Sequence, residues 1–366
     1  MVIKLGIPIV MDNLEVSLSK VEKIDEQILT LLNERFSLTS KLAQLQMLDS
    51  SSYNPTMQEE ILKRLTSKNC GPISDEIIYA IYREIFAGEQ KLNQPMKVAF
   101  LGPLGTFSHQ ATLEVFGSTT QLVPLKTIPE VFRVVECNRA NYGCVPIENS
   151  AEGVINYTMD WLVKSNVKII TEKYCRIHHF LMAKCQKNEI KRIYSHPQVL
   201  GQCQHYLLEN FPGIELVEMA STVYAAQKAA QEEYSAALGS PIASKLYGLN
   251  ILEENVEDSS SNTTRFLVIG TENTASTNDD KTSICFVVKN RPGALYEALE
   301  PFRRNQLQMT LIESRPWQQN PGWEYCFFVD ILGHQSDPKV SSVCQELEKN
   351  SAFFKILGSY PRIGLK

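Results

Sequence analysis

The feature that most constrains the fold is a long run of helical periodicity near the N-terminus. Residues 14–47 contain neither proline nor glycine, and apolar side chains recur there in steps of three and four residues. This spacing predicts one helix of about 35 residues, roughly 50 Å long. The apolar positions are Val21, Ile24, Ile28, Leu31, Leu38, Leu42 and Leu45, and Arg35 fills the one gap. A helix this long cannot bury its apolar side within one small domain, so we expect it to pair with a second copy of the chain.

Two shorter helical patterns complete an all-α region. The first covers residues 57–65 and follows a break at residues 49–55. Pro72 and Ser74 then precede a third pattern that has Asp75 and Glu76 in its first turn, where carboxylates are favoured. We therefore predict a helical domain over residues 12–94.

At residue 97 the sequence changes to short apolar runs that alternate with helical patterns. The expected strands are residues 98–101, 143–147, 193–195, 214–219 and 266–270, and the expected helices are residues 108–116, 154–163, 198–211 and 223–230. Such alternation predicts an α/β domain with mostly parallel sheets, here over residues 96–272. A linker rich in Thr, Asn, Ser and Asp follows at residues 271–280.

The last region, residues 281–361, is predicted to contain four strands and two helices. The expected strands are residues 283–288, 309–315, 325–331 and 354–360, and the expected helices are residues 293–304 and 339–350. Their order along the chain is βαββαβ, which is typical of a ferredoxin-like fold.

Composition and charge exclude several classes of protein. A length of 366 residues suits about two or three domains. A net charge of −5 without a long basic run argues against a nucleic-acid partner. The nine cysteines never form a CxxC pair and the six histidines never form an HxxxH pair, so we expect reduced thiols and no metal site. Neither a signal sequence nor a membrane-spanning segment is predicted, and we expect a soluble, cytoplasmic protein.

Five short motifs occur in a fixed order along the chain. They are Gly-Pro-Leu-Gly-Thr-Phe-Ser (102–108), Pro-Ile-Glu-Asn-Ser (146–150), Ser-His-Pro-Gln (195–198), Asn-Thr-Thr-Arg-Phe (262–266) and Glu-Ser-Arg-Pro (313–316). In this order they resemble the prephenate dehydratases of phenylalanine biosynthesis, and the chain resembles the fused form with an N-terminal chorismate mutase domain. Together with Pro-Gly-Ala-Leu (292–295), the last motif resembles an ACT domain, an amino-acid sensor attached to such dehydratases. The resemblance implies a two-lobed dehydratase domain similar to periplasmic binding proteins.

The resemblance also implies a reaction, the conversion of prephenate to phenylpyruvate, CO2 and water, without a metal or an organic cofactor. The enzyme must hold the carboxylates of prephenate and provide a proton donor at the departing hydroxyl. The family pattern Asn-x-Thr-Arg-Phe assigns the donor role to Thr264 rather than to its neighbour Thr263. The expected catalytic residues are Thr264, Asn149, Ser195 and Gln202, and the expected substrate-binding residues are Thr106, Ser108, Glu148, Ser150, Ser221, Thr222 and Arg265.

The residues themselves support an anion-binding cleft at strand-to-helix turns. Asn149 follows an expected strand, where ligands of open α/β sheets bind. Four such turns carry hydroxyl groups, and helix N-termini with free backbone N–H groups bind anions. For Ser195 and Gln202, a plain helix cap and an exposed helix face remain the alternatives. Arg176, His178 and His196 rank lower as general acids because the family pattern gives them no proton transfer.

The mutase-like region matches its family only in part. Arg35 lies in the apolar stripe and is similar to the family's ligand-facing arginine. An arginine expected two turns before Asp25 is replaced by Leu18, and a lysine late in the helix is replaced by Gln46. An arginine and its acidic neighbour on the second helix are replaced by Met57 and Gln58. Each lost group would lower the rate by about two to three powers of ten, so efficient mutase activity is not expected.

The C-terminal resemblance implies that phenylalanine binds as a feedback inhibitor across a dimer interface. The expected contacts are Gly293, Ala294 and Leu295 on one side and Glu313, Ser314 and Arg315 on the other. The implied assembly is a homodimer or homotetramer; a ferredoxin-like domain used only for dimerisation is the alternative. Three alternatives to a dehydratase with a weak mutase remain open: a fully bifunctional enzyme, an arogenate dehydratase, and a non-catalytic two-lobed binding protein with an ACT sensor.

Overall fold

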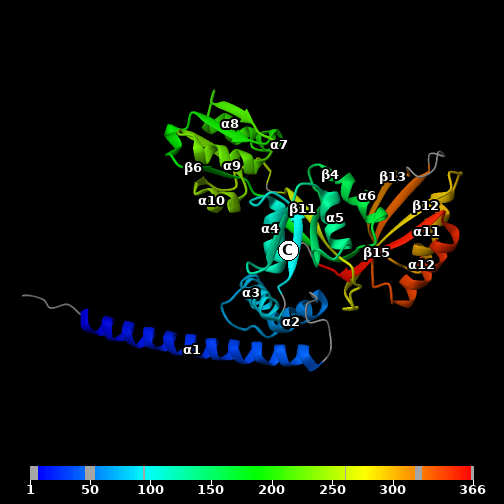
Figure 1. Cartoon of the computed structure of the whole chain (residues 1–366), viewed down its shortest axis with the longest axis horizontal. Coiled ribbons are helices and arrows are strands. Elements are labelled where there is room, and N and C mark those ends of the chain that lie inside the picture. The colour runs from blue at the N-terminus through cyan, green and yellow to red at the C-terminus, as the bar shows by residue number, and fades with distance from the viewer. Residues whose placement is uncertain (1–6, 46–53, 94, 260, 318–323, 364–366) are drawn as a thin grey trace, which may run out of the picture. The chain divides into compact units, whose positions relative to one another are not determined.

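The computed structural model describes residues 7–45, 54–93, 95–259, 261–317 and 324–363 (Figure 1). The chain divides into two compact units, Met1–Ser52 with Gly88–Pro95 and Tyr53–Ala87 with Met96–Lys366. The boundary between the units therefore falls inside the third helix. No helix within the described ranges is both long and apolar enough to cross a membrane.

The first unit is built around one long helix, α1 (Ile7–Leu45, 39 residues). The predicted helix is confirmed, but it begins at Ile7 rather than near residue 14, and Pro8 is compatible with the first turn because it needs no backbone N–H there. The apolar side chains on α1 are between 49% and 63% exposed within one chain: Val21, Ile24, Ile28, Leu31, Leu38 and Leu42. Pairing of this surface with a second copy stays a prediction.

The two other predicted helices are confirmed as α2 (Pro55–Lys68) and α3 (Asp75–Asn93). Asn54 caps α2, because its side chain accepts a hydrogen bond from the Met57 N–H at 3.0 Å. Asp75 and Glu76 occupy the first turn of α3, as expected from the favourable interaction of carboxylates with a helix N-terminus.

The second unit begins with a lobe that contains one mixed sheet in the order β2-β1-β3-β11-β5. The strands are β1 (Lys97–Leu101), β2 (Gln121–Leu125), β3 (Tyr142–Asn149), β5 (Lys168–Arg176) and β11 (Thr263–Gly270), with the short β4 (Gly153–Val154) beside β3. Helix α4 (Phe107–Phe116) covers one face, and α5 (Ile128–Glu136) and α6 (Asn156–Lys164) cover the other (Figure 1). We call this the first lobe.

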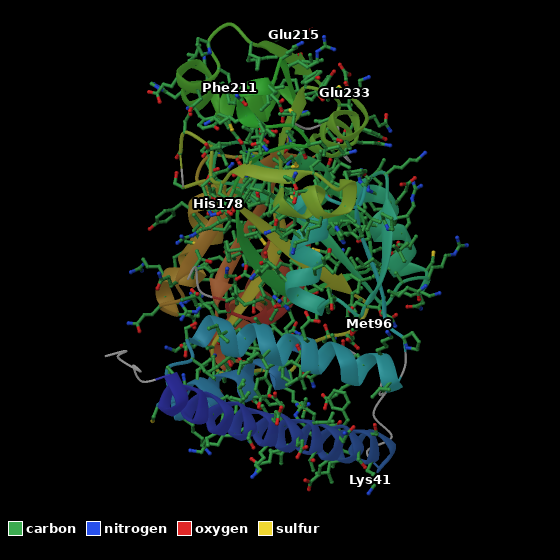
Figure 2. All side chains as sticks on the ribbon, turned by 90° about the vertical axis from the view of Figure 1, so that its left-hand side faces the viewer. Lys41, Met96, His178, Phe211, Glu215 and Glu233 are labelled. Atoms are coloured by element: carbon green, nitrogen blue, oxygen red, sulfur yellow. The ribbon has the colours of Figure 1, made fainter. Side chains whose placement is uncertain are left out.

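The second lobe contains the sheet β10-β6-β9-β7-β8. Its strands are β6 (Phe180–Ala183), β7 (Arg192–Ser195), β8 (Glu215–Glu218), β9 (Ser235–Gly239) and β10 (Asn250–Glu253), and its helices are α7 (Pro197–Gln202), α8 (Gln204–Asn210), α9 (Thr222–Gln231) and α10 (Pro241–Tyr247). The chain enters this lobe after β5 and leaves it before β11. Figure 2 labels His178 at the entry, and Phe211, Glu215 and Glu233 within the lobe.

The prediction of mostly parallel sheets is wrong. Strands β1, β2 and β3 are parallel, but β11 runs antiparallel to both β3 and β5 because it returns from the second lobe. In the second lobe, β6 is likewise antiparallel to both of its neighbours. The expected helix over residues 198–211 is divided into α7 and α8 at Cys203. Helix α5 was not predicted, although Thr127 and Glu130 form a capping box at its start.

The C-terminal domain has the predicted βαββαβ order. It comprises β12 (Asp280–Val288), α11 (Ala294–Arg304), β13 (Met309–Pro316), β14 (Tyr325–Leu332), α12 (Pro338–Asn350) and β15 (Phe353–Pro361). The antiparallel sheet has the order β13-β14-β12-β15, which is ferredoxin-like, and α11 and α12 cover one of its faces (Figure 1).

The other face of this sheet packs on the first lobe, and the two share one hydrophobic core. Val287 and Phe328 of the C-terminal domain belong to the same buried cluster as Ile169 and Leu267 of the first lobe. Strand β15 approaches β5 so closely that a Cβ at Gly358 would lie 2.3 Å from the Ile169 carbonyl oxygen. Only glycine permits this contact between the two backbones.

We predict that Gly358→Ala strongly destabilises the chain. The added methyl group must displace the backbone of β5, and overpacking of this kind costs about 1–3 kcal/mol or more. The measurement is the midpoint of thermal unfolding by calorimetry.

Gly201→Ala is the matched control, because a Cβ at Gly201 on α7 meets no atom within 4 Å. Alanine also has the higher helix propensity, so this variant should unfold at the wild-type temperature or slightly above it. Equal unfolding temperatures for the two variants would show that the approach of β15 to β5 is not as close as described.

Candidate functional site

The predicted catalytic residues Asn149 and Thr264 lie side by side where β3 ends and β11 begins. The strand register pairs Thr264 with Asn149 and Arg265 with Glu148. Successive side chains of a strand point to opposite faces, so one pair shares each face of the sheet. The fold therefore brings together two residues that are 115 positions apart in the sequence.

A β-bulge in β3 determines the face on which Asn149 lies. Arg265 pairs with Glu148 but Phe266 pairs with Pro146, so Ile147 is an extra residue in β3. Ile147 packs in the core shared with the C-terminal domain. Without the bulge, strand alternation would place Asn149 on that same face, and the extra residue turns it toward Thr264 instead.

Every polar group of the Asn149 side chain is engaged. Its Nδ2 donates to Thr264 Oγ1 at 2.8 Å and to Asn262 Oδ1 at 2.9 Å, and its Oδ1 accepts from the Ala151 N–H at 2.9 Å. Because the Thr264 oxygen accepts from Asn149, the hydroxyl proton is left to donate in another direction. Thr264 is only 7% exposed, and a donor in such a site is worth more than in water.

Gln202 of the second lobe joins this group through Asn262. Gln202 Oε1 accepts from Asn262 Nδ2 at 3.4 Å and lies 2.8 Å from His179 Nε2. An amide oxygen only accepts, so His179 carries its proton on Nε2. Burial lowers the pKa of His179 and keeps the ring neutral. We call Asn149, Gln202, Asn262 and Thr264 the amide cluster.

One member of the amide cluster, Asn262, and one residue that supports it, His179, were not predicted as site residues. Asn262 bridges the two lobes, and His179 fixes the orientation of Gln202. The signal for Asn262 was its place at the start of the motif at residues 262–266. His179 gave no sequence signal of this kind; its neighbour His178 binds Glu257, with 2.6 Å between Nδ1 and Oε1.

Ser195 does not belong to the amide cluster, contrary to expectation. It ends β7 with its side chain fully buried, and its Oγ donates to the Leu238 carbonyl at 2.9 Å. The hydroxyl therefore satisfies the backbone of β9. Ser195 is not the expected helix cap either, because His196 occupies the N-cap position of α7.

The hydroxyl-bearing turns cap helices at the boundary between the lobes. Thr106 Oγ1 accepts from the His109 N–H at the start of α4, and Ser221 Oγ accepts from the Tyr224 N–H at the start of α9. Ser108 lies in the first turn of α4 and Thr222 in that of α9.

Gly105 brings the first of these turns against the second lobe. Its carbonyl accepts from Ser240 Oγ at 2.5 Å, and a Cβ at this position would lie 3.3–3.4 Å from Leu246 and Val223. With φ of +95°, the backbone here also favours glycine. The turn at residues 102–108 therefore lies directly on the second lobe.

Three other predicted binding residues lie outside the amide cluster. Ser150 Oγ accepts from the Thr263 N–H at 2.9 Å and donates to the Ser261 carbonyl, so it fastens two loops together. Glu148 and Arg265 share the opposite face of the sheet. Arg265 forms ion pairs with Glu172 and Asp330 on that face. Because neighbouring side chains of a strand point to opposite faces, Arg265 cannot contact the same ligand as Thr264, and this expectation is wrong.

A large cavity of about 730 Å³ lies beside the amide cluster rather than at it. It is lined by α2, α3, α4, β5, the end of β15 and the loop before β11, and it includes Thr263 but neither Thr264 nor Asn149. Its charged lining residues are Glu59, Glu76, Arg83, Glu114, Glu172, Lys173 and Arg176. Both signs of charge are present, so the lining selects no single class of ligand. In the described part of the chain, no group of three or more His, Cys, Asp and Glu side chains is placed to hold a metal ion.

In the first unit, the predicted mutase-site residue Arg35 has an acidic partner. Its guanidinium forms an ion pair with Glu89 of α3, and Thr39 Oγ1 donates to the same carboxylate at 2.9 Å. Sequence analysis did not identify Glu89. Leu18 and Met57, which replace family arginines, are 55% and 52% exposed. Gln46 lies outside the described residues.

Two family models match the chain. The prephenate dehydratase model matches residues 98–274, and the chorismate mutase type II model matches residues 18–92. A bifunctional chorismate mutase/prephenate dehydratase from Aquifex aeolicus is 41% identical over 358 residues, which cover 96% of this chain and 99% of the relative. The chain belongs to the chorismate mutase/prephenate dehydratase family. It is thus an enzyme with a dehydratase and a mutase domain, and the family predicted from its motifs is confirmed.

Two solved structures are similar over 73% of this chain. The prephenate dehydratase from Arthrobacter aurescens, solved in complex with L-Phe, is 31% identical with a TM-score of 0.68, and 90% of that chain is covered. GqqA, described as a novel type of quorum quenching acylase, is 28% identical with a TM-score of 0.67, and 98% of that chain is covered. The family fold thus occurs with more than one described activity.

The expected effector residues of this family member lie on two segments of the C-terminal domain. Gly293 has φ of +79° and precedes Ala294 and Leu295 at the start of α11. Glu313 and Ser314 lie on β13, which is an edge strand. Arg315 instead contacts the first lobe, where its Nη1 donates to the Asn156 carbonyl at 2.7 Å and lies 3.2 Å from Asp160. The predicted meeting of the two segments involves a second chain and stays a prediction.

We predict that mild acid weakens the turn between the lobes. His109 Nδ1 accepts from the Gly105 N–H at 3.0 Å, so protonation of the ring removes this hydrogen bond. Burial lowers the pKa of His109 below its usual 6.5. The unfolded state therefore binds the proton more readily, and the free energy of unfolding falls as the pH decreases below about 6.5. Urea unfolding between about pH 7.5 and 5.5 measures this slope.

In His109→Gln the pH dependence should be smaller than in the wild type. His205 on α8 is 84% exposed, so His205→Gln is a control that should retain the wild-type slope. Identical slopes in the two variants would exclude the buried ring of His109 as the source of the acid sensitivity.

Proposed function

We propose that the chain converts prephenate to phenylpyruvate, with Thr264 as the hydrogen-bond donor to the departing hydroxyl. The observation that carries this proposal is the 2.8 Å hydrogen bond from Asn149 Nδ2 to Thr264 Oγ1. It makes the Thr264 oxygen an acceptor within the protein, so its proton is directed to a ligand. A fixed donor in a nearly dry site stabilises the charge that develops on a leaving oxygen.

The electron flow of the reaction needs no redox partner. The bond between the ring and its carboxylate breaks to release CO2, its electron pair forms a ring double bond, and the C4 hydroxyl departs with the electrons of its own bond. The departing hydroxide becomes water by gaining a proton. The ring becomes aromatic, so the protein has to position the substrate and stabilise the leaving oxygen rather than drive an unfavourable step.

Gln202 and the helix N-termini between the lobes are proposed to bind the two carboxylates of prephenate. Both hydrogen bonds to Gln202 Oε1 fix the amide plane, which leaves Nε2 as an oriented donor. The turn before α4 lies against the first turn of α9, since a Cβ at Gly105 would lie 3.4 Å from Val223, and helix N-termini favour anions. Carboxylates bound there would hold the two lobes together around the substrate.

The mutase domain is proposed to be slow. Arg35 is balanced by Glu89, and Leu18 and Met57 provide no cation for a carboxylate. Full bifunctionality is the second candidate, because the Aquifex aeolicus relative is described as bifunctional and matches nearly the whole chain.

The C-terminal domain is proposed to be an ACT domain that binds phenylalanine at Gly293, Ala294 and Leu295 and at Glu313 and Ser314. Support comes from the ferredoxin-like sheet and from the Arthrobacter aurescens relative, which was solved with L-Phe. A homo-oligomer formed through the exposed side of α1 is part of this proposal. So are the domain boundaries 12–94, 96–272 and 281–361.

We predict that Thr264→Ala lowers kcat for prephenate by about 100- to 1,000-fold, because it removes the donor at the leaving oxygen. Thr263→Ala is the matched control, since Thr263 points to the other face of β11. It should retain activity within a few-fold of the wild type. Phenylpyruvate formation is the measurement, and a Thr264→Ala enzyme as active as the Thr263→Ala enzyme would refute the assignment.

We also predict that purified protein forms phenylpyruvate from prephenate at least about a thousand-fold faster than from chorismate, since several mutase contacts are missing. The two substrates are assayed in parallel, with arogenate as a third. Similar rates for prephenate and chorismate would establish full bifunctionality instead. Turnover of arogenate alone would make the chain an arogenate dehydratase, and turnover of none would favour a binding protein.

A further inference from the structure

A buried charged cluster links the first lobe to the C-terminal domain directly behind Thr264. It consists of Arg265 on β11, Glu172 on β5, Lys281 on β12, Asp330 on β14 and Tyr360 on β15, which we call the junction cluster. All five residues are at most 6% exposed. The cluster therefore connects two strands of the first lobe with three strands of the C-terminal domain.

Arg265 is at the centre of the junction cluster. Its Nε donates to Glu172 Oε2 at 2.9 Å, and its Nη2 donates to the Tyr360 hydroxyl at 3.0 Å. Nη2 also lies 2.7 Å from Asp330 Oδ2, which is an ion pair without hydrogen-bond geometry, while Asp330 Oδ1 accepts a hydrogen bond from Ser283 Oγ. Lys281 Nζ donates to Glu172 Oε1 at 2.8 Å. Two cations and two carboxylates thus balance each other, and removal of any one leaves the buried cluster with a net charge.

Stability alone does not account for such a cluster. The cost of burying charges offsets much of their attraction, and well-packed apolar residues often serve as well or better. Charged hydrogen bonds do fix geometry, because they are directional and fail when a partner shifts. The junction cluster therefore sets the position of β11 against the C-terminal domain more sharply than the surrounding apolar core can.

The position of β11 matters because Thr264 directly precedes Arg265 on this strand. Arg265 and Thr264 are neighbours on opposite faces of one strand, so a displacement of the Arg265 backbone also displaces the Thr264 hydroxyl. The hydrogen bond between Thr264 and Asn149 is 2.8 Å long and tolerates little displacement.

We propose that Asp330 is a positioning residue for the dehydratase: by holding Arg265, it fixes β11 and keeps the Thr264 hydroxyl aligned with Asn149. Tyr360 supports Arg265 directly, and Lys281 does so through Glu172. This inference rests on the proposed role of Thr264.

The first test is Asp330→Asn, which removes the charge and preserves the shape of the side chain. We expect kcat for prephenate to fall by about 10- to 100-fold, as for a small misplacement of a catalytic group, while KM stays within about two-fold. Glu346→Gln is the matched control: it removes a carboxylate from the same domain, but its partner Arg304 is exposed. This control should have wild-type kcat and KM.

A second variant covers the case in which Asp330→Asn does not fold. Lys281→Met combined with Asp330→Asn gives a junction cluster without net charge, in which Arg265 and Glu172 are the two remaining charged side chains. It should fold, with kcat per folded molecule reduced as in the single variant. A purely structural role would lower the unfolding temperature but leave kcat per folded molecule unchanged, and that result would overturn the proposal.

Hydrogen–deuterium exchange provides a readout that does not depend on turnover. In the double variant, amides of β11 and the end of β3 should exchange faster, while those of β7 and β9 in the second lobe should be unaffected. Unchanged exchange in β11 would overturn the proposal even if the wild type did not turn over prephenate. Absence of turnover by the wild type would instead refute the proposed function, so the two failures are distinguishable.

Discussion

The pairing of β11 with β3 is the interaction on which the rest of the dehydratase half depends. β11 returns from the second lobe and inserts between β3 and β5, so one strand closes the first lobe and brings Thr264 to Asn149. The bulge at Ile147 then directs Asn149 out of the shared core and toward the lobe boundary. One extra residue thereby converts a core position into a site position.

The same strand faces the C-terminal domain with its other side. Arg265 lies among buried charges there, and the apolar core and the close approach of Gly358 to Ile169 surround it. The dehydratase lobe and the ferredoxin-like domain therefore share one core rather than meeting through a thin contact. In the motif at residues 262–266, Thr264 is thus a candidate catalytic residue, and the adjacent Arg265 contacts the C-terminal domain.

In the helical unit, the apolar side chains of α1 between Val21 and Leu42 that form the predicted stripe are about half exposed within one chain. The ion pair between Arg35 and Glu89 gives the cation in this stripe a partner from the same chain. An arginine in an apolar stripe is therefore explained as well by a structural ion pair as by ligand binding. The family match over residues 18–92 shows the ancestry of this region.

The sequence by itself determined most of the helices and strands, the order of the three regions and the family, because periodicity and motif order are local properties of the chain. It also identified Thr264, Asn149 and Gln202, which the fold brings together. Only the tertiary structure decided that Ser195 turns into the second lobe, that Arg265 faces the C-terminal domain, and that Asn262 and His179 complete the group. The physical reason is that strand register and a single bulge decide the face on which a side chain lies, and both depend on partners far away in the sequence.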